Sequence, residues 1–245
     1  MQVVNRPPGT EQEQVIDSAF YVLDPAELAE PARHVAYPLA TLKALSPQHW
    51  ALMELRDGAD LPILQKCYGA FAALSPDWLD FRYELHMTAD KGIFREKSSS
   101  GLLPLFQGRM VWQYNAHYDT PAYWLDASVF DQHLKSKELY RMAQDLRVPK
   151  TEVAQYAGAV RYDRDFLRLG FRDIARDTDE RTLIFSLLPK NIGVGNKISV
   201  SIPKIYVRSE DGGVTTQAVS PLRLLFALAW FNSLPVDWLA RFMIQ

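Results

Sequence analysis

The chain has 245 residues, of which 48% are hydrophobic and 23% charged, and its formal net charge is -2. This length supports one large or two modest domains, and the composition is that of a folded protein. The near-neutral total excludes a global basic field, although a local basic patch is still able to bind nucleic acid.

The charges are unevenly distributed along the chain. Residues 1–100 hold 9 Lys and Arg against 14 Asp and Glu, whereas residues 147–208 hold 12 against 7. A basic third inside an acidic chain is typical of a surface that faces an anion. The alternative is a solvated, charged face of a sheet.

Cysteine content and hydropathy restrict the compartment. The single cysteine, Cys67, excludes an intramolecular disulfide and lies in an apolar segment where we expect it to be buried. Residues 1–13 are polar and do not resemble a secretory signal. The longest apolar run is about ten residues, half of what a membrane-spanning helix needs. We expect a soluble, cytoplasmic protein with no membrane partner.

The first part of the chain predicts one strand followed by short helices. Residues 14–23 alternate in polarity as a strand does. Ser46 and Pro47 have the pattern of an N-cap and a first helical residue, so we predict a helix that ends at Gly58. A similar Asp-Leu-Pro start at residue 60 and a Ser-Pro-Asp start at residue 75 predict two more helices.

Strand-forming residues dominate from residue 78 onward. Residues 78–87 read as a strand, 97–101 as a loop, and 102–114 as two short strands around a turn at Gln107–Gly108. We predict a helix near 136–146 and a turn at 209–213. Four further segments have strand character: 152–162, 165–175, 181–189 and 197–207.

The last segment opens with Ser220–Pro221 and is apolar nearly all round, which predicts a buried helix pair broken at Pro235. The predicted fold class is therefore α/β (α+β), with N-terminal helices, a mixed and mostly antiparallel β-sheet, and a closing C-terminal helix. We place an N-terminal strand and helical subregion at 1–100 and a β-rich subdomain at 101–245.

Several common catalytic motifs are missing from the sequence. It contains neither a GxxxxGK[ST] phosphate-binding loop nor a GxGxxG motif after a strand. A single cysteine excludes a zinc site built on cysteine pairs, and the five histidines lack HExxH spacing. The usual nuclease pair of a carboxylate and a lysine two residues later is also absent. The chain therefore carries no recognisable methyltransferase or nuclease motif, and whether it is an enzyme stays open.

Four segments resemble one protein family. Leu103–Tyr114 (LPLFQGRMVWQY) is similar to the start of the specificity half of large type II and type IIG restriction-modification methyltransferases. Phe171–Ile184 (FRDIARDTDERTLI) closely resembles a signature of that family. The segments at 193–197 (GVGNK) and 232–238 (NSLPVDW) resemble further parts of the same pattern. Together these segments span more than half of the chain.

The resemblance implies a target recognition domain, similar to the TaqI-like specificity domain of adenine-N6 DNA methyltransferases. In that family a catalytic domain of the same chain binds S-adenosylmethionine and flips adenine out of the duplex. This sequence has no such cofactor motif, so we expect no cofactor in this chain. The implied partners are double-stranded DNA and the catalytic domain of a longer parent protein. The implied setting is type II restriction-modification and phage defence.

Cations and amides near these segments are the candidate DNA ligands. Arginine forks match phosphate and guanine edges, asparagine reads adenine, and glycines allow close backbone approach. The candidates are Arg109, Arg161, Arg164, Arg168, Arg176, Arg181, Lys190, Asn191, Asn196 and Lys197.

Acidic residues within the signature favour a structural role, because dense negative charge repels phosphate. We predict that Asp179 and Glu180 pair with Arg172 and Arg176 in an ion network that holds two strands together. Surface neutralisation remains the alternative for the arginines at 161–168, and a hairpin without DNA contact for 190–197. Trp112, Tyr123 and Trp124 are candidates for stacking on a base, although aromatic residues in strands more often belong to the core.

Two other functions are consistent with the sequence. One is a protein-interaction or scaffold domain whose basic surface meets an acidic partner and does not bind DNA. The other is a complete enzyme whose chemistry has no recognisable motif.

Overall fold

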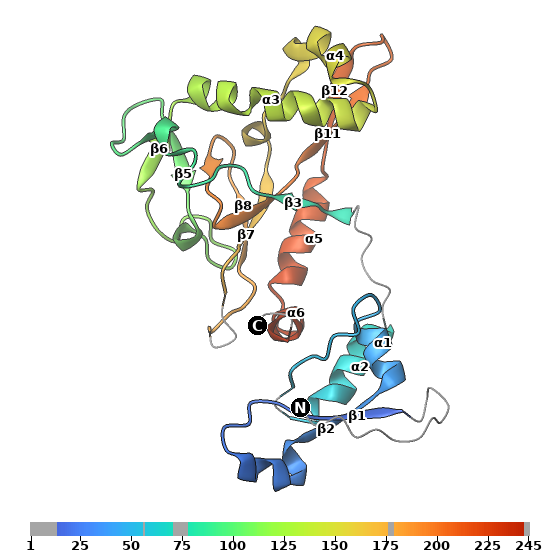
Figure 1. Ribbon diagram of the computed structural model, residues 1–245. Coiled ribbons are helices and arrows are strands. Elements are labelled where there is room, and N and C mark those ends of the chain that lie inside the picture. Colours follow the sequence, from blue (N-terminus) through green and yellow to red (C-terminus); the bar gives the residue numbers. More distant parts are fainter. Residues whose placement is uncertain (1–13, 56, 71–77, 176–178, 243–245) are drawn as a thin grey trace. The chain divides into compact units, whose positions relative to one another are not determined.

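The computed structural model describes residues 14–55, 57–70, 78–175 and 179–242. The fold is α+β, as predicted (Figure 1). Contacts along the chain define two units, one of residues 1–75 with 241–245 and one of residues 76–240. The predicted boundary at 100/101 is therefore too late, because residues 81–82 already pair with the sheet of the second unit.

The first unit contains a two-stranded antiparallel sheet and two helices. Strand β1 (Val15–Ala19) pairs with β2 (His34–Pro38), and α1 (Leu39–Leu45) and α2 (Asp60–Ala70) follow. The predicted strand at 14–23 and the helix from Asp60 are confirmed. The predicted helix over 47–58 is wrong. Trp50 has a left-handed φ of 52°, and residues 51–55 have no regular structure.

A four-stranded antiparallel sheet forms the centre of the second unit, in the order β3-β10-β7-β8. Its strands are β3 (Phe81–Arg82), β7 (Arg168–Arg172), β8 (Phe185–Leu188) and β10 (Ile198–Ser201). The strand segments predicted at 165–175 and 181–189 are confirmed, and the segment at 197–207 contains β10 and β11.

Alternation of side chains gives this central sheet two apolar faces. Leu169 and Phe185 point to one face, where Leu224 and Ala227 of α5 (Pro221–Phe231) cover them. The opposite face belongs to a second cluster, which includes Phe106, Val111, Leu188, Ile198 and Val200. The sheet is therefore a middle layer between α5 and the segments around residues 106–116.

A second four-stranded sheet has the order β4-β6-β5-β9. It consists of β4 (Phe94–Arg95), β5 (Leu103–Phe106), β6 (Tyr123–Leu125) and β9 (Gly193–Val194), and β5 runs parallel to β9. Only one of the two strands predicted over 102–114 forms, because a 3-10 turn, η5 (Gly108–Met110), follows β5.

The remaining elements are helical or form a ribbon. Helix α3 (Ala127–Leu146) contains the predicted helix at 136–146 and packs against β11 (Lys204–Arg208), which pairs with β12 (Val214–Ala218). The predicted strand at 152–162 is wrong, since α4 (Lys150–Val153) and a 3-10 helix at Ala154–Ala159 occupy it. The last helix, α6 (Leu234–Arg241), begins one residue before Pro235. The helix pair is therefore interrupted at Asn232–Ser233, slightly before the predicted position.

Candidate nucleic-acid interface

The segments that carry the family resemblance lie next to one another in the fold. A Cβ atom on Gly108 would lie 3.1 Å from the carbonyl oxygen of Lys197, so the two backbones touch. Arg172 donates from Nε to the carbonyl oxygen of Val111 at 2.7 Å. Parts of three of these segments, at Gly108–Val111, Arg172 and Lys197, thus lie next to one another.

The fourth segment attaches a helix to the edge strand β8. Asn232 accepts a hydrogen bond from the N–H of Phe185 at 3.0 Å and donates to its carbonyl oxygen at 2.9 Å. The carboxylate of Asp237 accepts from the N–H groups of Thr182 and Leu183 at 2.8 and 2.7 Å. These bonds satisfy backbone groups at the free edge of a sheet, which would otherwise be open to another strand. Asn232 and Asp237 therefore stabilise the fold.

Arg109 and Lys197 are the exposed cations at the place where these segments meet. The side chain of Arg109 is 53% exposed, pairs with Asp119 at 3.0 Å and donates to the carbonyl oxygen of Thr120 at 3.2 Å. Lys197 is exposed, and its ammonium has no acidic partner among the described residues. Lys197 is therefore available to a phosphate, whereas Arg109 keeps half of its side chain exposed beside its bond to Asp119.

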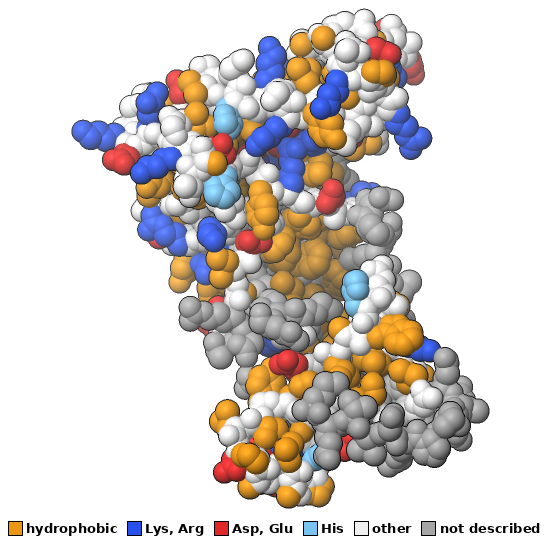
Figure 2. Space-filling view, viewed as in Figure 1, with side chains coloured by type: hydrophobic (Ala, Val, Ile, Leu, Met, Phe, Trp, Pro, Cys, Tyr) orange, Lys and Arg blue, Asp and Glu red, His pale blue; other side chains and the backbone are white. Residues whose placement is uncertain are grey.

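Arg161 and Lys190 are also exposed, and in the described part of the chain their side chains make no ion pair. They lie on different elements. The backbone of Arg161 is held by the hydroxyl of Tyr206 on β11, whereas Lys190 follows β8. Figure 2 shows Lys and Arg side chains spread over the part of the molecule that contains β4 to β6, α3 and β11.

Arg168 does not reach the surface, so the prediction that it contacts DNA is not supported. Its side chain is fully buried and pairs with Glu84 at 2.6 Å. A second guanidinium nitrogen donates to the carbonyl oxygen of Ile192 at 2.9 Å, and the second oxygen of Glu84 accepts from the N–H of Val194 at 2.8 Å. Through these bonds the ion pair connects β9 to the central sheet. Loss of either partner would leave an unpaired charge in the interior, which is costly.

Arg164 and Asn191 belong to a hydrogen-bonded group of side chains that also includes Asp131. Arg164 forms two bonds of 2.7 Å to the carboxylate of Asp131, and a third nitrogen donates to the side-chain oxygen of Asn191 at 3.1 Å. The bond to Asp131 raises the pKa of the Arg164 guanidinium. Asn191 has a left-handed φ of 59°. These contacts occupy the groups that would read a base, so the cluster favours a structural role.

Two more of the predicted DNA ligands, Asn196 and Arg181, contact other parts of the protein. The side-chain oxygen of Asn196 accepts from the N–H of Met87 at 3.0 Å. A nitrogen of the half-buried Arg181 lies 3.9 Å from the carboxylate of Asp237. Arg176 lies outside the described residues.

The glycines of the 193–197 segment serve protein packing. A Cβ atom on Gly193 would lie 2.2 Å from a methyl group of Leu125, and one on Gly195 would lie 2.5 Å from the sulfur of Met87. Both glycines are buried. The close backbone approach that we predicted here is therefore an approach to the protein's own side chains.

Arg172 bonds to the backbone and packs on an aromatic ring, while its predicted ion network with Asp179 and Glu180 stays a prediction. Besides Val111, its guanidinium lies over the ring of Trp112 at 5.1 Å. Burial lowers the pKa of Arg172, against the opposing influence of Tyr118 and Asp179. Asp179 and Glu180 are exposed and have interactions of their own. The bond to Val111 and the ring of Trp112 hold the guanidinium of Arg172 in place.

A larger ion network lies in the interior, and the sequence did not predict it. The carboxylates of Glu138 and Asp163 each contact three cations. Two of these cations are Arg141 and Lys204, which lie 2.7–3.1 Å from both carboxylates. Arg82 bonds to both carboxylates as well. Burial raises the pKa of Asp163, but the three cations outweigh burial and hold it below its ordinary value. The only local signal is the i, i+3 pair of Glu138 and Arg141, since the other partners are far apart in sequence.

Of the aromatic candidates on β6, Tyr123 packs against the core. Tyr123 packs against Phe94, with ring centroids 5.8 Å apart, and both border a cluster around Leu105 and Leu125. Trp124 is half-buried. Trp112 lies beside Arg172 and Val111, next to the region of Arg109 and Lys197.

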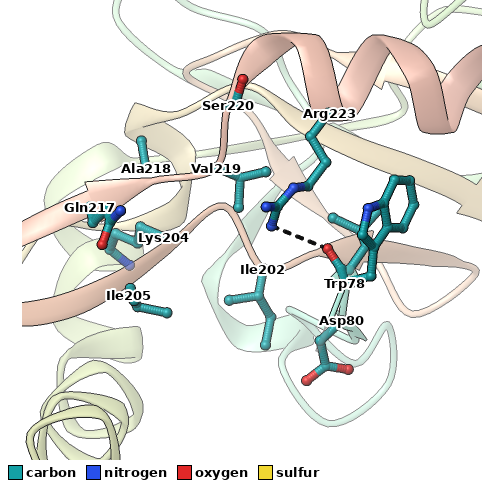
Figure 3. Close-up of a pocket in the computed structure, with 11 residues that line it drawn as sticks. Trp78, Asp80, Ile202, Lys204, Ile205, Gln217, Ala218, Val219, Ser220 and Arg223 are labelled. Atoms are coloured by element: carbon teal, nitrogen blue, oxygen red, sulfur yellow. Dashed lines mark hydrogen bonds between the residues drawn. The ribbon is translucent and has the colours of Figure 1, made fainter. Parts of the chain in front are cut away.

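A pocket of about 340 Å³ lies between β11, β12 and the start of α5 (Figure 3). In it, Arg223 donates to the carbonyl oxygen of Trp78 at 3.4 Å. The ammonium of Lys204 is engaged by Glu138 and Asp163. The pocket shares no lining residue with the surface of Arg109 and Lys197, and its polar groups form no acid-base pair that suggests catalysis.

The described residues contain no cluster of three or more metal-ligating side chains. None of the described helices is long and apolar enough to span a membrane. Comparison with known protein families and with curated proteins finds no match to this chain.

Proposed function

We propose that this chain is a DNA target recognition domain, which binds duplex DNA for N6-adenine methylation by a separate catalytic domain. The observation that carries the proposal is the meeting of three resembling segments at one surface, where Arg109 and Lys197 are exposed. In the resemblance these segments belong to the specificity half, and exposed cations on rigidly held loops are suited to phosphate contact.

The proposed interface is smaller than the set of residues chosen from the sequence. Arg109 and Lys197 supply phosphate contacts at its centre, while Arg161 and Lys190 are exposed cations on other elements. Arg168 is buried in an ion pair with Glu84, and Arg164 bonds to Asp131 and to the exposed Asn191, so these contacts support the scaffold. Binding by few cations predicts modest affinity with a clear dependence on salt.

The methyl-transfer chemistry belongs to the parent protein in this proposal. The resemblance implies that a catalytic domain binds S-adenosylmethionine and carries the Asn-Pro-Pro-aromatic motif. The domain described here then fixes that domain on its target sequence. The setting that the resemblance implies is a cytoplasmic restriction-modification system acting against phage DNA.

The proposal is tested by fluorescence anisotropy of the chain with labelled duplex DNA across a salt series. The double variant Arg109→Ala/Lys197→Ala is expected to bind more weakly at low salt. The slope of log K against log salt is expected to fall in magnitude by about two, one for each phosphate that the variant no longer neutralises. Lys97→Ala/Lys137→Ala removes two exposed cations elsewhere and serves as the matched control. Absence of duplex binding even at low ionic strength would contradict the proposal.

A second candidate function, a protein-interaction domain, is favoured by the outer face of α5. Leu222 is 78% exposed and Phe226 is 60% exposed, and Leu225 and Trp230 are partly exposed on the same helix. This contradicts the prediction of a helix buried all round. Hydrophobic side chains gather over α5 in Figure 2, and such patches often contact proteins. This function predicts that Phe226→Asp abolishes binding to a protein partner while duplex DNA is not bound at any salt.

A further inference from the structure

The loop after η5 presents a small aromatic platform to solvent. Trp112 and Tyr118 stack with ring centroids 5.4 Å apart and planes 24° from parallel. The guanidinium of Arg172 lies over the same tryptophan ring at 5.1 Å. Tyr118 is 57% exposed, and Tyr114 from the same loop is 60% exposed. A partly buried cation and a half-buried indole thus support an exposed phenol ring.

Hydrogen bonds fix the backbone of this loop. Trp112 and Asn115 exchange backbone bonds of 2.8 and 3.0 Å, which makes Gln113 and Tyr114 the tip of a tight turn. The N–H of Tyr118 donates to the carbonyl oxygen of Met110 at 3.0 Å.

Two further bonds attach the turn to the region of β8. The N–H of Tyr114 donates to the carbonyl oxygen of Phe185 at 3.0 Å, and the amide of Gln113 donates to the carbonyl oxygen of Leu183 at 2.9 Å. Tyr114 adopts a left-handed φ of 63°, which is rare outside glycine and costs free energy. Hydrogen bonds therefore fix the backbone at both exposed tyrosines, and the conformational cost falls on Tyr114 at the tip of the turn.

A cation lies beside the platform. The guanidinium of Arg109 bonds to Asp119 and to the carbonyl oxygen of Thr120, the two residues that follow Tyr118. The backbone of Gly108 touches that of Lys197, so a second exposed cation belongs to the same region. An aromatic face next to exposed cations is the combination that binds unpaired nucleotides, because the ring stacks on the base and the cations contact phosphate.

We propose that Tyr118, supported by Trp112 and Arg172, stacks on a nucleobase that is unpaired or displaced from duplex DNA, with Arg109 and Lys197 at the adjoining phosphates. This inference rests on the proposed function and adds a ligand class to it. A base is favoured over a protein side chain because Arg109 is anchored on the two residues that follow Tyr118, and the backbone of its neighbour Gly108 touches that of Lys197. Stacking does not distinguish one base from another. This site therefore adds affinity for a distorted duplex without contributing sequence specificity.

The test compares three duplexes of equal length in anisotropy titrations with the chain. One is fully paired, one has a single bulged 2-aminopurine, and one has a bulged abasic site in the same position. The base bulge is expected to bind about 5- to 100-fold more tightly than the abasic bulge, and its fluorescence is expected to be quenched on binding. Tyr118→Ala should remove both effects, whereas Tyr118→Phe should retain them. The matched control Tyr140→Ala removes another exposed tyrosine, on α3, and should change neither.

The outcomes separate this inference from the function on which it rests. If none of the three duplexes binds at low salt, the proposed DNA-binding function fails. If all three duplexes bind equally and Tyr118→Ala has no effect, the stacking inference alone is overturned. The exposed tyrosines would then be assigned to a contact with a protein. A thermal melt shows whether each variant is folded, and an equal loss of affinity for all three duplexes in a folded Tyr118→Ala variant also overturns stacking.

Discussion

The carboxylate of Glu84 lies 2.6 Å from the guanidinium of Arg168, and neither side chain is more than 1% exposed. The two residues are 84 positions apart in sequence. Burial raises the pKa of Glu84, and the charge of Arg168 opposes this effect. An arginine that looks like a DNA ligand in the sequence therefore serves to neutralise a buried acid.

Replacement of Arg168 is expected to reduce stability and to leave DNA contacts in place. Arg168→Met leaves Glu84 buried and unpaired, which costs about 3–5 kcal/mol. The double variant Arg168→Met/Glu84→Gln removes both charges while an amide oxygen still accepts from Val194, so it should be more stable than the single variant. Urea unfolding measures the difference. If Arg168→Met left stability unchanged but weakened duplex binding, Arg168 would be a DNA ligand and the structural role assigned to it would be wrong.

Acid is expected to destabilise the chain through Asp163. The pKa of its carboxyl is lowered in the folded state by Arg82, Arg141 and Lys204. The folded state therefore binds this proton less tightly than the unfolded chain, so the contribution to stability is full well above the ordinary value of 3.8. It is lost progressively as pH falls below about 5. Glu84 titrates in the opposite sense, since its raised pKa makes its ionisation cost stability as pH rises.

Asp163→Asn isolates this contribution. The variant should be less stable than the parent at neutral pH, because three cations then face Glu138 alone. Its stability should also depend less on pH in the acid range. Urea unfolding at several pH values measures both, and an unchanged slope in acid would show that other carboxylates govern acid denaturation.

Local sequence patterns identified much of the secondary structure. The Asp60–Pro62 start predicted α2, and apolar alternation predicted β7 and β8. The pattern failed at 152–162, where small residues of low strand propensity (Ala154, Ala157 and Gly158) instead continue a helical path after Pro149. It failed after Ser46 as well, since a serine-proline start also fits a turn.

The site was less predictable than the fold, because its contacts join distant residues. Exposed cations such as Arg109 and Lys197 were identifiable by residue type and by their neighbouring glycines. The burial of Arg168 was not, because its partner Glu84 lies in another part of the chain. Tyr118 lay in a segment with mixed composition, and its stacking on Trp112 depends on a turn that no local pattern specifies.

The attachment of Asn232 to β8 gives a second stability prediction. Asn232→Ala leaves the buried N–H of Phe185 without its acceptor, while the carbonyl oxygen of Phe185 keeps a bond from Tyr114. The expected loss is about 1–3 kcal/mol, the cost of one unsatisfied buried group. Gln132→Ala removes an exposed amide on α3, serves as the control and should change stability by less than about 0.5 kcal/mol. Equal stabilities for the two variants in urea would contradict the role of Asn232.

Gly193 is expected to tolerate no side chain. A methyl group there would lie 2.2 Å from Leu125 and 3.4 Å from Phe130, inside a closely packed cluster. Gly193→Ala should therefore cost about 1–3 kcal/mol through overpacking. Gly158→Ala is the matched control, because its added methyl group meets no atom within 4 Å. Adding Leu125→Val to Gly193→Ala makes space for the methyl group and should recover part of the loss. If the urea midpoints of the two single variants coincide, β9 is held less closely against β5 and β6 than these distances indicate.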